Sequence, residues 1–240
     1  MFKNLRRKLS KKEMASEQAY DAWSKDYDSQ PDNLMLALDE IIFSQLLKEI
    51  NIQNKIIADI GCGTGRHWKL LMEMHPRQLT GYDVSAGMLR ILTEKFPGAV
   101  THKLIDNRLA ATADNAVDIL ISTLTVAHIE DISDALHEWD RVAKAGADII
   151  ITDYHPDILQ KGGKRTFKVN DKTVAVKNHV HPVEKIKSLA AGLGWTLKNQ
   201  EERRVDDRVK HFYEKQNALN VFELYKEMPV IYGLHFTKPI

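Results

Sequence analysis

A cluster of glycines near residue 60 has the spacing of a ligand-binding turn. Gly61, Gly63 and Gly65 alternate with other residues directly after a short apolar run, and glycine lets a backbone approach a ligand closely at positive φ. A dinucleotide-binding turn has the spacing G-x-G-x-x-G, whereas here Arg66 follows the third glycine. Asp59, two residues before the first glycine, would repel a pyrophosphate and attract an ammonium group. The turn therefore favours a ligand with an ammonium group over a dinucleotide.

Two further acids stand where the next apolar runs end. Asp83 closes the run 79–83, and Asp106 follows the run 99–105. The first acid occupies the position at which a carboxylate accepts hydrogen bonds from two ribose hydroxyls, and ligands bind at the carboxyl ends of such strands. Asp106 could accept a hydrogen bond from an adenine amino group. The two acids therefore predict a nucleoside ligand.

Candidate proton-transfer groups follow the later apolar runs. His128 comes after the run 117–122, Tyr154 and His155 come after 147–153, and His179 lies further along the chain. A general base is needed only when the group that reacts arrives protonated. We predict catalytic roles for His128, Tyr154 and His155, although a histidine in a loop is more often an ordinary hydrogen-bonded or solvated residue.

Three other side chains have a chemical and an ordinary interpretation. Arg165 could pair with a substrate carboxylate or phosphate, or it could lie on a hairpin surface. His179 and His181 together with His155 could hold zinc or iron, but no carboxylate spacing accompanies them, and we predict no metal. Cys62 is predicted to be a small turn residue rather than a nucleophile, because the sequence places no base beside it.

The chain from residue 55 alternates short apolar runs with helix-like stretches. This alternation is typical of right-handed βαβ units and of a parallel sheet covered on both faces, so the fold class is α/β. The runs that predict strands are 56–60, 79–83, 99–105, 117–122 and 147–153. The stretches that predict helices are 65–75, 85–96, 108–113 and 130–144.

Helices are predicted before this core at 14–28 and 33–50, the second with an apolar face. After the core, 165–169 and 173–177 predict a hairpin, and the last elements are a helix at 182–192, a strand at 195–205, a helix at 212–227 and a strand at 230–236. One domain, 13–240, is expected. We divide it into a helical cap at 13–54, a cofactor-binding core at 55–153 and a substrate-side hairpin with closing strands at 154–240.

A basic segment, 1–12, precedes the domain. Residues 2–12 hold six basic residues and no acid, with Phe2, Leu5 and Leu9 at helical spacing. The segment could be an amphipathic helix that docks on a membrane, but a solvated tail is the simpler interpretation.

The composition excludes several classes of partner. Thirty-four Lys and Arg against thirty-three Asp and Glu leave a formal charge of +1, so no overall field attracts nucleic acid or an anionic membrane. No apolar run is long enough to span a bilayer, and the first residues do not form a secretory signal. One cysteine cannot form an internal disulfide, which fits a reducing compartment. A cytoplasmic protein is expected.

At these residues the sequence resembles the class I S-adenosylmethionine-dependent methyltransferases. The segments that carry the resemblance are IADIGCGTG at 57–65, LTGYDVSAGML at 79–89, 105–122 and 128–153. Within the family, YDAWSKDYDSQPDN at 20–33 is similar to small-molecule methyltransferases of the type 11/25 group, which includes ubiquinone and menaquinone C-methyltransferases. The resemblance implies a Rossmann-like, mostly parallel seven-stranded sheet with helices on both faces, an N-terminal helical cap and a hairpin insertion after the fifth strand.

The resemblance also implies a cofactor and the residues that hold it. S-adenosyl-L-methionine would bind and leave as S-adenosyl-L-homocysteine. Its expected contacts are Tyr20, Tyr27, Asp59, Gly61, Cys62, Gly63, Gly65, Asp83, Val84, Met88, Asp106, Asn107 and Thr123. The acceptor would be bound by Trp23, His128, Tyr154, His155, Arg165 and His179.

The function expected from this resemblance is methyl transfer by in-line displacement to a small-molecule acceptor. One alternative is a quinone-type C-methyltransferase that acts on a membrane lipid and uses the basic segment for docking. The other is a cofactor-binding module without catalysis. A nucleic-acid acceptor is not expected, because the net charge is close to zero and no basic domain is attached.

Overall fold

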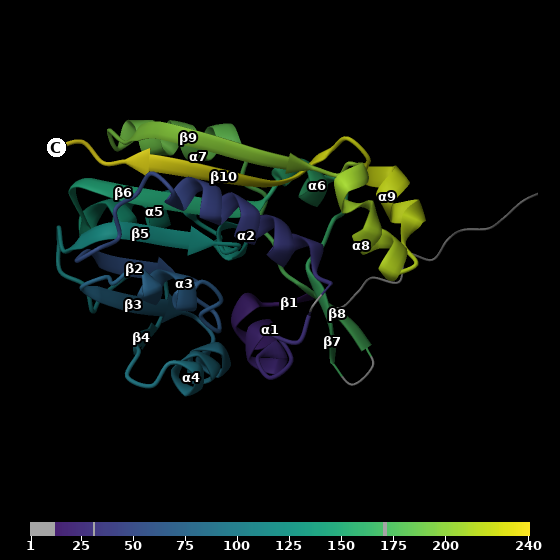
Figure 1. Cartoon of the computed structure of the whole chain (residues 1–240), viewed down its shortest axis with the longest axis horizontal. Helices are drawn as coiled ribbons and strands as arrows, with labels where there is room; N and C mark the ends of the chain where they lie inside the picture. Colours follow the sequence, from purple (N-terminus) through teal and green to yellow (C-terminus); the bar gives the residue numbers. More distant parts are fainter. Residues whose placement is uncertain (1–12, 31, 170–171) are drawn as a thin grey trace, which may run out of the picture.

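The computed structural model describes residues 13–30, 32–169 and 172–240. A seven-stranded sheet crosses the molecule in the order β4-β3-β2-β5-β6-β10-β9 (Figure 1). Its strands are β2 (Ile56–Ile60), β3 (Gln78–Asp83), β4 (Val100–Lys103), β5 (Val117–Thr123), β6 (Ala143–Tyr154), β9 (Thr196–Arg204) and β10 (Pro229–Thr237). In this order, the five strands from β4 through β3, β2 and β5 to β6 pair in parallel with their neighbours. Strand β10 pairs antiparallel with both β6 and β9. The predicted α/β class and mostly parallel seven-stranded sheet are confirmed.

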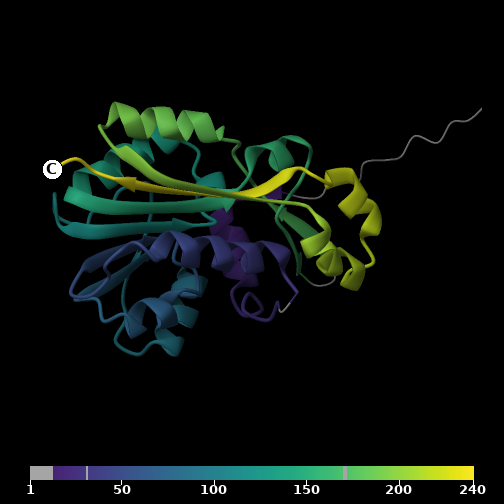
Figure 2. The same ribbon diagram turned by 45° about the horizontal axis from the view of Figure 1, so that its top comes forward.

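Alternate residues of the central strands face two separate cores. Leu120 of β5 packs with the helices α5 (Ile132–Val142) and α7 (Val183–Gly192). Its neighbours Ile119 and Ile121 pack on the other face, with α2 (Leu34–Leu47) and α3 (Trp68–Glu73). Both faces are therefore covered, as a parallel sheet requires. Figure 2 shows α7 and α2 on opposite sides of the sheet.

Side-chain caps fix where several helices begin. The Asn33 side chain accepts hydrogen bonds from the backbone amides of Met35 and Leu36 and so starts α2. Ser85 caps α4 (Ala86–Lys95), and Asp131 caps α5. Such caps satisfy amides that have no partner inside the helix. Only Val84 and the capping residue Ser85 separate the end of β3 at Asp83 from the start of α4.

Two predicted helices differ from the structure. No helix forms at 108–113, because the Leu109 amide donates to Glu138 and the Thr112 carbonyl accepts from Arg141, which ties this segment to α5. The predicted helix 212–227 is instead two helices, α8 (Lys210–Lys215) and α9 (Leu219–Tyr225). Between them Asn217 has φ of 52°, which a right-handed helix does not accommodate.

A second, small sheet lies beyond the carboxyl ends of the parallel strands. It joins β1 (Glu13–Met14), β8 (Lys172–Val176) and β7 (Thr166–Val169), next to α1 (Ser16–Trp23), and α6 (Pro156–Gln160) connects β6 to it (Figure 1). Strands β7 and β8 pair antiparallel where the hairpin was predicted, while the pairing of β1 with β8 was not predicted. Phe2, Leu5 and Leu9 lie outside the described residues. The first predicted helix, 14–28, is shortened to α1.

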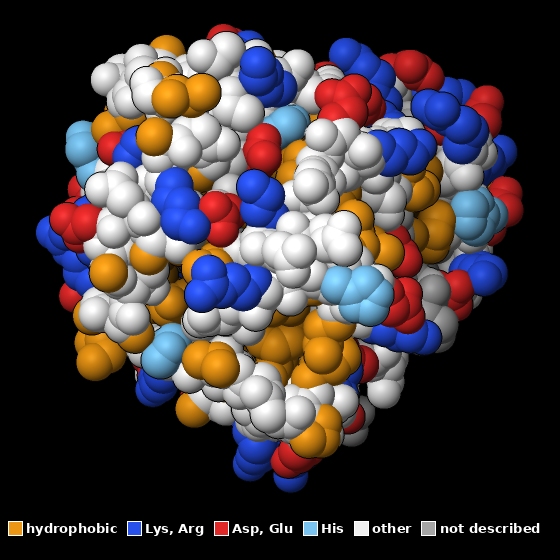
Figure 3. All heavy atoms as spheres, turned by 60° about the vertical axis from the view of Figure 1, so that its left-hand side comes forward, with side chains coloured by type: hydrophobic (Ala, Val, Ile, Leu, Met, Phe, Trp, Pro, Cys, Tyr) orange, Lys and Arg blue, Asp and Glu red, His pale blue; other side chains and the backbone are white. Residues whose placement is uncertain are grey.

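The surface carries no single-sign region in the view of Figure 3, where acidic and basic side chains are interspersed with neutral and apolar ones. This mixture agrees with the formal charge of +1. In the described part of the chain, no helix has both the length and the apolar character needed to span a bilayer.

Candidate functional site

The glycine turn after β2 is held in a conformation that needs glycine. Gly61 has φ of 71°, and a Cβ atom there would lie 2.0 Å from Thr125 Oγ1, which excludes any side chain. Gly63 has φ of 53°, but no heavy atom lies within 4 Å of the position of its Cβ. The turn therefore packs against the protein at Gly61 and faces open space at Gly63.

Asp83 is fixed beside this open space by two backbone amides. Its Oδ2 accepts from Gly63 N at 2.8 Å, and its Oδ1 accepts from Ser85 N at 2.8 Å. Burial raises the pKa of Asp83 to about 6 despite these hydrogen bonds. Each carboxylate oxygen keeps a further lone pair, so the group can accept two more hydrogen bonds from a ligand.

Asp59 lies at the end of β2, on the same side of the turn. The Trp68 indole donates to its Oδ2 at 2.8 Å. Burial, with a smaller contribution from the charge of Asp83, raises the pKa of Asp59 to about 7. A cationic ligand beside this carboxyl group would restore its charged form.

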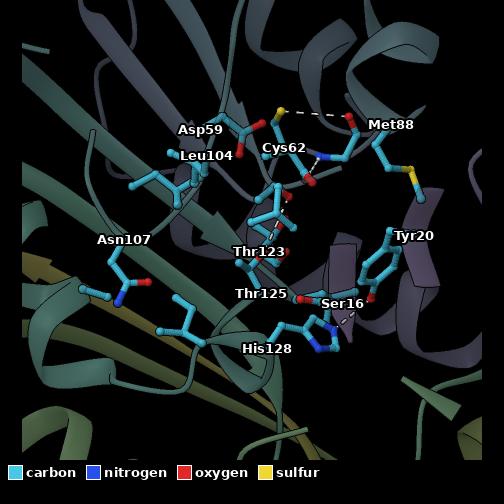
Figure 4. Close-up of a pocket in the computed structure, with 18 of the residues that line it drawn as sticks. Ser16, Tyr20, Asp59, Cys62, Met88, Leu104, Asn107, Thr123, Thr125 and His128 are labelled. Atoms are coloured by element: carbon cyan, nitrogen blue, oxygen red, sulfur yellow. Dashed lines mark hydrogen bonds between the residues drawn. The ribbon is translucent and has the colours of Figure 1, made fainter. Parts of the chain in front are cut away.

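These groups line one cavity of about 250 Å³ at the carboxyl ends of β2, β3 and β5. Figure 4 shows Asp59 and Cys62 on one side of it and Tyr20 and His128 on another. We call it the first cavity. The predicted cofactor contacts that line it are Tyr20, Tyr27, Asp59, Gly61, Cys62, Gly63, Asp83, Val84, Met88, Asp106, Asn107 and Thr123. His128 and Arg165, predicted on the acceptor side, line it as well.

Gly65, which was predicted to contact the cofactor, does not line the first cavity. Its φ is 74°, and a Cβ there would lie 3.1 to 3.2 Å from Leu92, Phe96 and Trp68. This glycine serves the close packing of the turn against α4, not ligand contact. Cys62 is buried, with its thiol pKa raised by burial, which agrees with its predicted role as a turn residue rather than a nucleophile.

A second cavity adjoins the first, and two predicted acceptor residues lie there. Trp23 and Tyr154 line this space of about 970 Å³, together with residues of α2, α8 and α9. Arg165 lines both cavities. These three side chains come from α1, from the end of β6 and from the segment before β7.

His155 and His179 line neither cavity, so the structure does not bring them together with the other predicted site residues. His155 caps α6 by accepting from the Asp157 amide, and its ring lies edge-on to Tyr232. His179 has its ring stacked on His181. In the described residues, no group of three His, Cys, Asp or Glu side chains could hold a metal ion.

His128 belongs to a buried cluster with Tyr20 and Arg165. Its Nε2 lies 2.8 Å from Tyr20 Oη and 2.9 Å from Arg165 Nη1, while its Nδ1 lies 3.2 Å from the Lys177 carbonyl. A carbonyl only accepts, so Nδ1 carries the proton and Nε2 is the acceptor. Burial and the Arg165 charge lower the pKa of His128 to about 3. The ring is therefore neutral, and the single lone pair of Nε2 already faces two donors of the protein.

Arg66 is a site residue for which the sequence gave no role. It lines the first cavity, its Nη2 pairs with Asp39 of α2, and its Nη1 is buried without a hydrogen-bond partner among the described residues. Asp39 also contacts His67 Nε2 at 2.9 Å and the Thr152 hydroxyl. The signal was Asp39, one of two acids in the mostly apolar stretch 34–43; an acid on the buried face of such a helix indicates a charge with a partner.

Ile105 is a second missed residue. It lines the first cavity and is 95% exposed, so its side chain offers apolar surface to a ligand in that cavity. Next to it, Asp106 accepts from the Arg108 amide, and the Asn107 side chain donates to Asp134. An aromatic ring placed here would cover Ile105.

Comparison with known proteins agrees with this geometry. Residues 58–151 match a family described as a methyltransferase domain. The chain is 31% identical over 151 residues to a demethylmenaquinone methyltransferase of Bacteroides fragilis, covering 59% of this chain and 60% of the relative. The chain therefore spans less than two thirds of the length of this curated relative.

Two solved structures share the fold at low identity. One is an S-adenosylmethionine-dependent methyltransferase of Mesorhizobium loti, with a TM-score of 0.63, 15% identity and coverage of 82% of this chain and 97% of the other. The other is the cyclase SpnF, with a TM-score of 0.71, 16% identity and coverage of 95% and 98%. The matched domain and the sheet order agree with a class I S-adenosylmethionine-dependent methyltransferase, and the two solved structures show that the chain shares this fold.

Proposed function

We propose that this chain transfers the methyl group of S-adenosylmethionine to a small-molecule acceptor. The observation that carries the proposal is the set of groups around one open glycine turn: two buried carboxyl groups and an arginine whose buried Nη1 has no partner within the described part of the chain. When bound, the cofactor supplies a methyl group on a sulfonium; the acceptor's electron pair bonds to that carbon, and the S–C electron pair stays on sulfur, leaving S-adenosylhomocysteine.

The residues of the first cavity fit each polar part of this cofactor. Asp83, anchored by two amides, would accept hydrogen bonds from the two ribose hydroxyls, and Asp59 would attract the ammonium group. Arg66 Nη1, which has no partner among the described residues, would bind the carboxylate of the methionine part. A charge-assisted hydrogen bond of this kind contributes about 1.5 to 3 kcal/mol.

The adenine would lie at the exposed side of the same cavity. Val84, Met88 and Ile105 offer apolar surface there, and Asp106 offers an acceptor for the amino group. Covering Ile105 would also remove the largest exposed apolar side chain of this region from water. Apolar burial as well as hydrogen bonds would therefore contribute to the affinity for the cofactor.

The acceptor would meet the methyl group near Tyr20, Thr123 and His128. We propose that His128 is a positioning residue, since a ring with a pKa of about 3 is a weak base near neutral pH. Its Nε2 instead orients the Tyr20 hydroxyl and the Arg165 guanidinium. Holding an acceptor in line with the methyl group accounts for about 7 to 11 kcal/mol of barrier lowering in such reactions.

A second candidate is carbon methylation of a quinone precursor, which the name of the Bacteroides relative favours. The aromatic side chains of the second cavity, Trp23, Tyr154, Tyr213 and Tyr225, would pack against such a ring. In this candidate the lipid tail of the acceptor would have to leave through the open side of that cavity.

The proposal is tested in two steps with the full chain. Calorimetry with S-adenosylhomocysteine should show one site per chain, and methyl-labelled S-adenosylmethionine incubated with a desalted cell extract should place label in a small-molecule fraction. Label in the lipid fraction would favour the quinone candidate. Cofactor binding without any labelled product in extracts from several growth conditions would favour a non-catalytic module.

A further inference from the structure

Arg165 is a buried cation between the two cavities. It directly precedes β7, is 8% exposed and lines both cavities. The Tyr154 ring lies against its guanidinium, with 4.8 Å from Cζ to the ring centroid. The side chain is thus held in one place by an aromatic face and the cluster around His128.

Only one nitrogen of this guanidinium has protein partners among the described residues. Nη1 reaches the Tyr20 hydroxyl, the Leu124 carbonyl at 3.0 Å and His128 Nε2 at 2.9 Å. Nη2 is buried with no partner, and Nε donates to no acceptor within the same part of the chain. The Nε–Nη2 edge is the edge that matches two oxygens of a carboxylate or phosphate.

No carboxylate of the described residues lies within 4 Å of Arg165. Asp153 acts on it electrostatically from further away, and its own oxygens accept from the amides of Ala127 and Tyr154. Burying a cation without a paired anion is costly. Such a group is stabilised when a ligand brings the missing negative charge.

The other charges of the second cavity are already paired. Asp32 contacts Lys215 at 2.6 Å, and Lys164 pairs with Glu13. Arg165 is therefore the charged lining residue, within the described ranges, that is left without a counter-ion. The cavity as a whole favours a ligand with one negative group and apolar or aromatic surface.

We propose that the methyl acceptor is a small aromatic or apolar acid whose carboxylate or phosphate binds the Nε–Nη2 edge of Arg165. Its body lies in the second cavity against Trp23 and Tyr154, and its reacting end extends past Arg165 to Tyr20 and His128 in the first. This inference deepens the proposed function and rests on it. It assigns the acceptor's charge, which the fold and the relatives leave open.

The test uses the full chain saturated with S-adenosylhomocysteine and three probes: benzoate, phenyl phosphate and the neutral benzamide. By calorimetry, benzoate or phenyl phosphate should bind at least tenfold more tightly than benzamide, and the tighter of the two identifies the anion.

Arg165→Met should abolish this preference, weakening the binding of the anion at least tenfold and that of benzamide less than twofold. Arg165→Lys should keep part of it. The matched control Lys187→Met removes a paired charge outside both cavities and should leave the preference unchanged.

Several results would overturn the inference. Equal binding of benzoate and benzamide, an undiminished preference in Arg165→Met, or no anion binding up to 10 mM would each do so. If Arg165→Met loses S-adenosylhomocysteine instead, Arg165 binds the cofactor and not the acceptor. If the unaltered chain does not bind S-adenosylhomocysteine at all, the proposed function fails. The binding of the three probes is then measured on the chain without S-adenosylhomocysteine. Should Arg165→Met not fold, the Lys variant and the comparison of probes still decide.

Discussion

At the residue scale, the site depends on polar groups whose partners inside the protein are incomplete. Asp83 has two amide donors and spare lone pairs, Asp59 has one indole donor, and Arg66 and Arg165 each have a buried nitrogen without a partner among the described residues. Unsatisfied buried groups are rare in folded proteins. The two arginine nitrogens belong to residues that line the cavities, where a ligand could supply the missing partners.

Replacing Asp83 by Ala should lower the affinity for S-adenosylhomocysteine at least tenfold. The change removes the acceptor for two hydrogen bonds, each worth about 1.5 to 3 kcal/mol when one partner is charged, and frees the Gly63 amide from its anchor. Calorimetry measures the effect, and Asp207→Ala, an exposed acid outside both cavities, is the control. An unchanged dissociation constant would contradict the ribose assignment.

The affinity for S-adenosylhomocysteine should fall as the pH is lowered from 8 to 5. Burial holds the pKa of Asp59 at about 7 and that of Asp83 at about 6, so both lose their charge across this range while the ammonium group of the ligand keeps its own. Bound ligand favours the ionised carboxyl groups, and protons therefore compete with it. Binding measured at half-unit pH intervals should weaken steadily below pH 7.

Asp59→Asn should remove the upper part of this pH dependence, since only Asp83 is then left to titrate. A flat profile in the unaltered chain would show that neither carboxyl group faces the charged part of the ligand. At this scale the sequence predicted a set of cofactor residues that mostly line one cavity, because glycines and acids at strand ends meet at the same edge of a parallel sheet. It could not place His155 or His179, because a histidine after a strand can turn toward a helix cap as easily as toward a cavity.

At the element scale, α2 is joined to the site through one buried acid. Asp39 accepts from Arg66, His67 and the Thr152 hydroxyl of β6, and burial is outweighed by these partners, which lower its pKa. The helix thus covers the sheet and also holds the arginine that faces the first cavity. The sequence predicted the helix from its apolar face but could not predict the partners of Asp39, which come from β6 and the glycine turn.

Asp39→Ala should destabilise the fold by about 3 kcal/mol, because it leaves a buried arginine without its counter-ion. Urea unfolding measures the loss. The double variant Asp39→Ala with Arg66→Met should recover much of it, since the unpaired charge is then gone, while S-adenosylhomocysteine affinity should stay low without Arg66. Equal stability of the single and double variants would show that the ion pair does not set the cost.

At the scale of the whole molecule, the first cavity is assembled from parts that are distant in sequence. Tyr20 comes from α1, Asp59 and Asp83 from the sheet, and Arg165 from the segment that precedes β7. Hydrophobic periodicity predicted the sheet and most helices, because each is a local pattern. It did not predict that β1 pairs with β8 and joins α1 to the hairpin, because that contact spans about 160 residues of chain.

Cofactor binding should therefore slow amide exchange in α1 and in the β7–β8 pair as well as in the glycine turn. A ligand that contacts α1 and the sheet together stabilises them against local opening, by about 2.7 kcal/mol at a concentration of one hundred times the dissociation constant. Hydrogen–deuterium exchange with and without S-adenosylhomocysteine should show protection at 16–23 and 172–176. The strand β9 at the far edge of the sheet should exchange equally in both states. Protection confined to the glycine turn would mean that the cap and the small sheet do not close on the cofactor, and that the acceptor reaches it through a different opening.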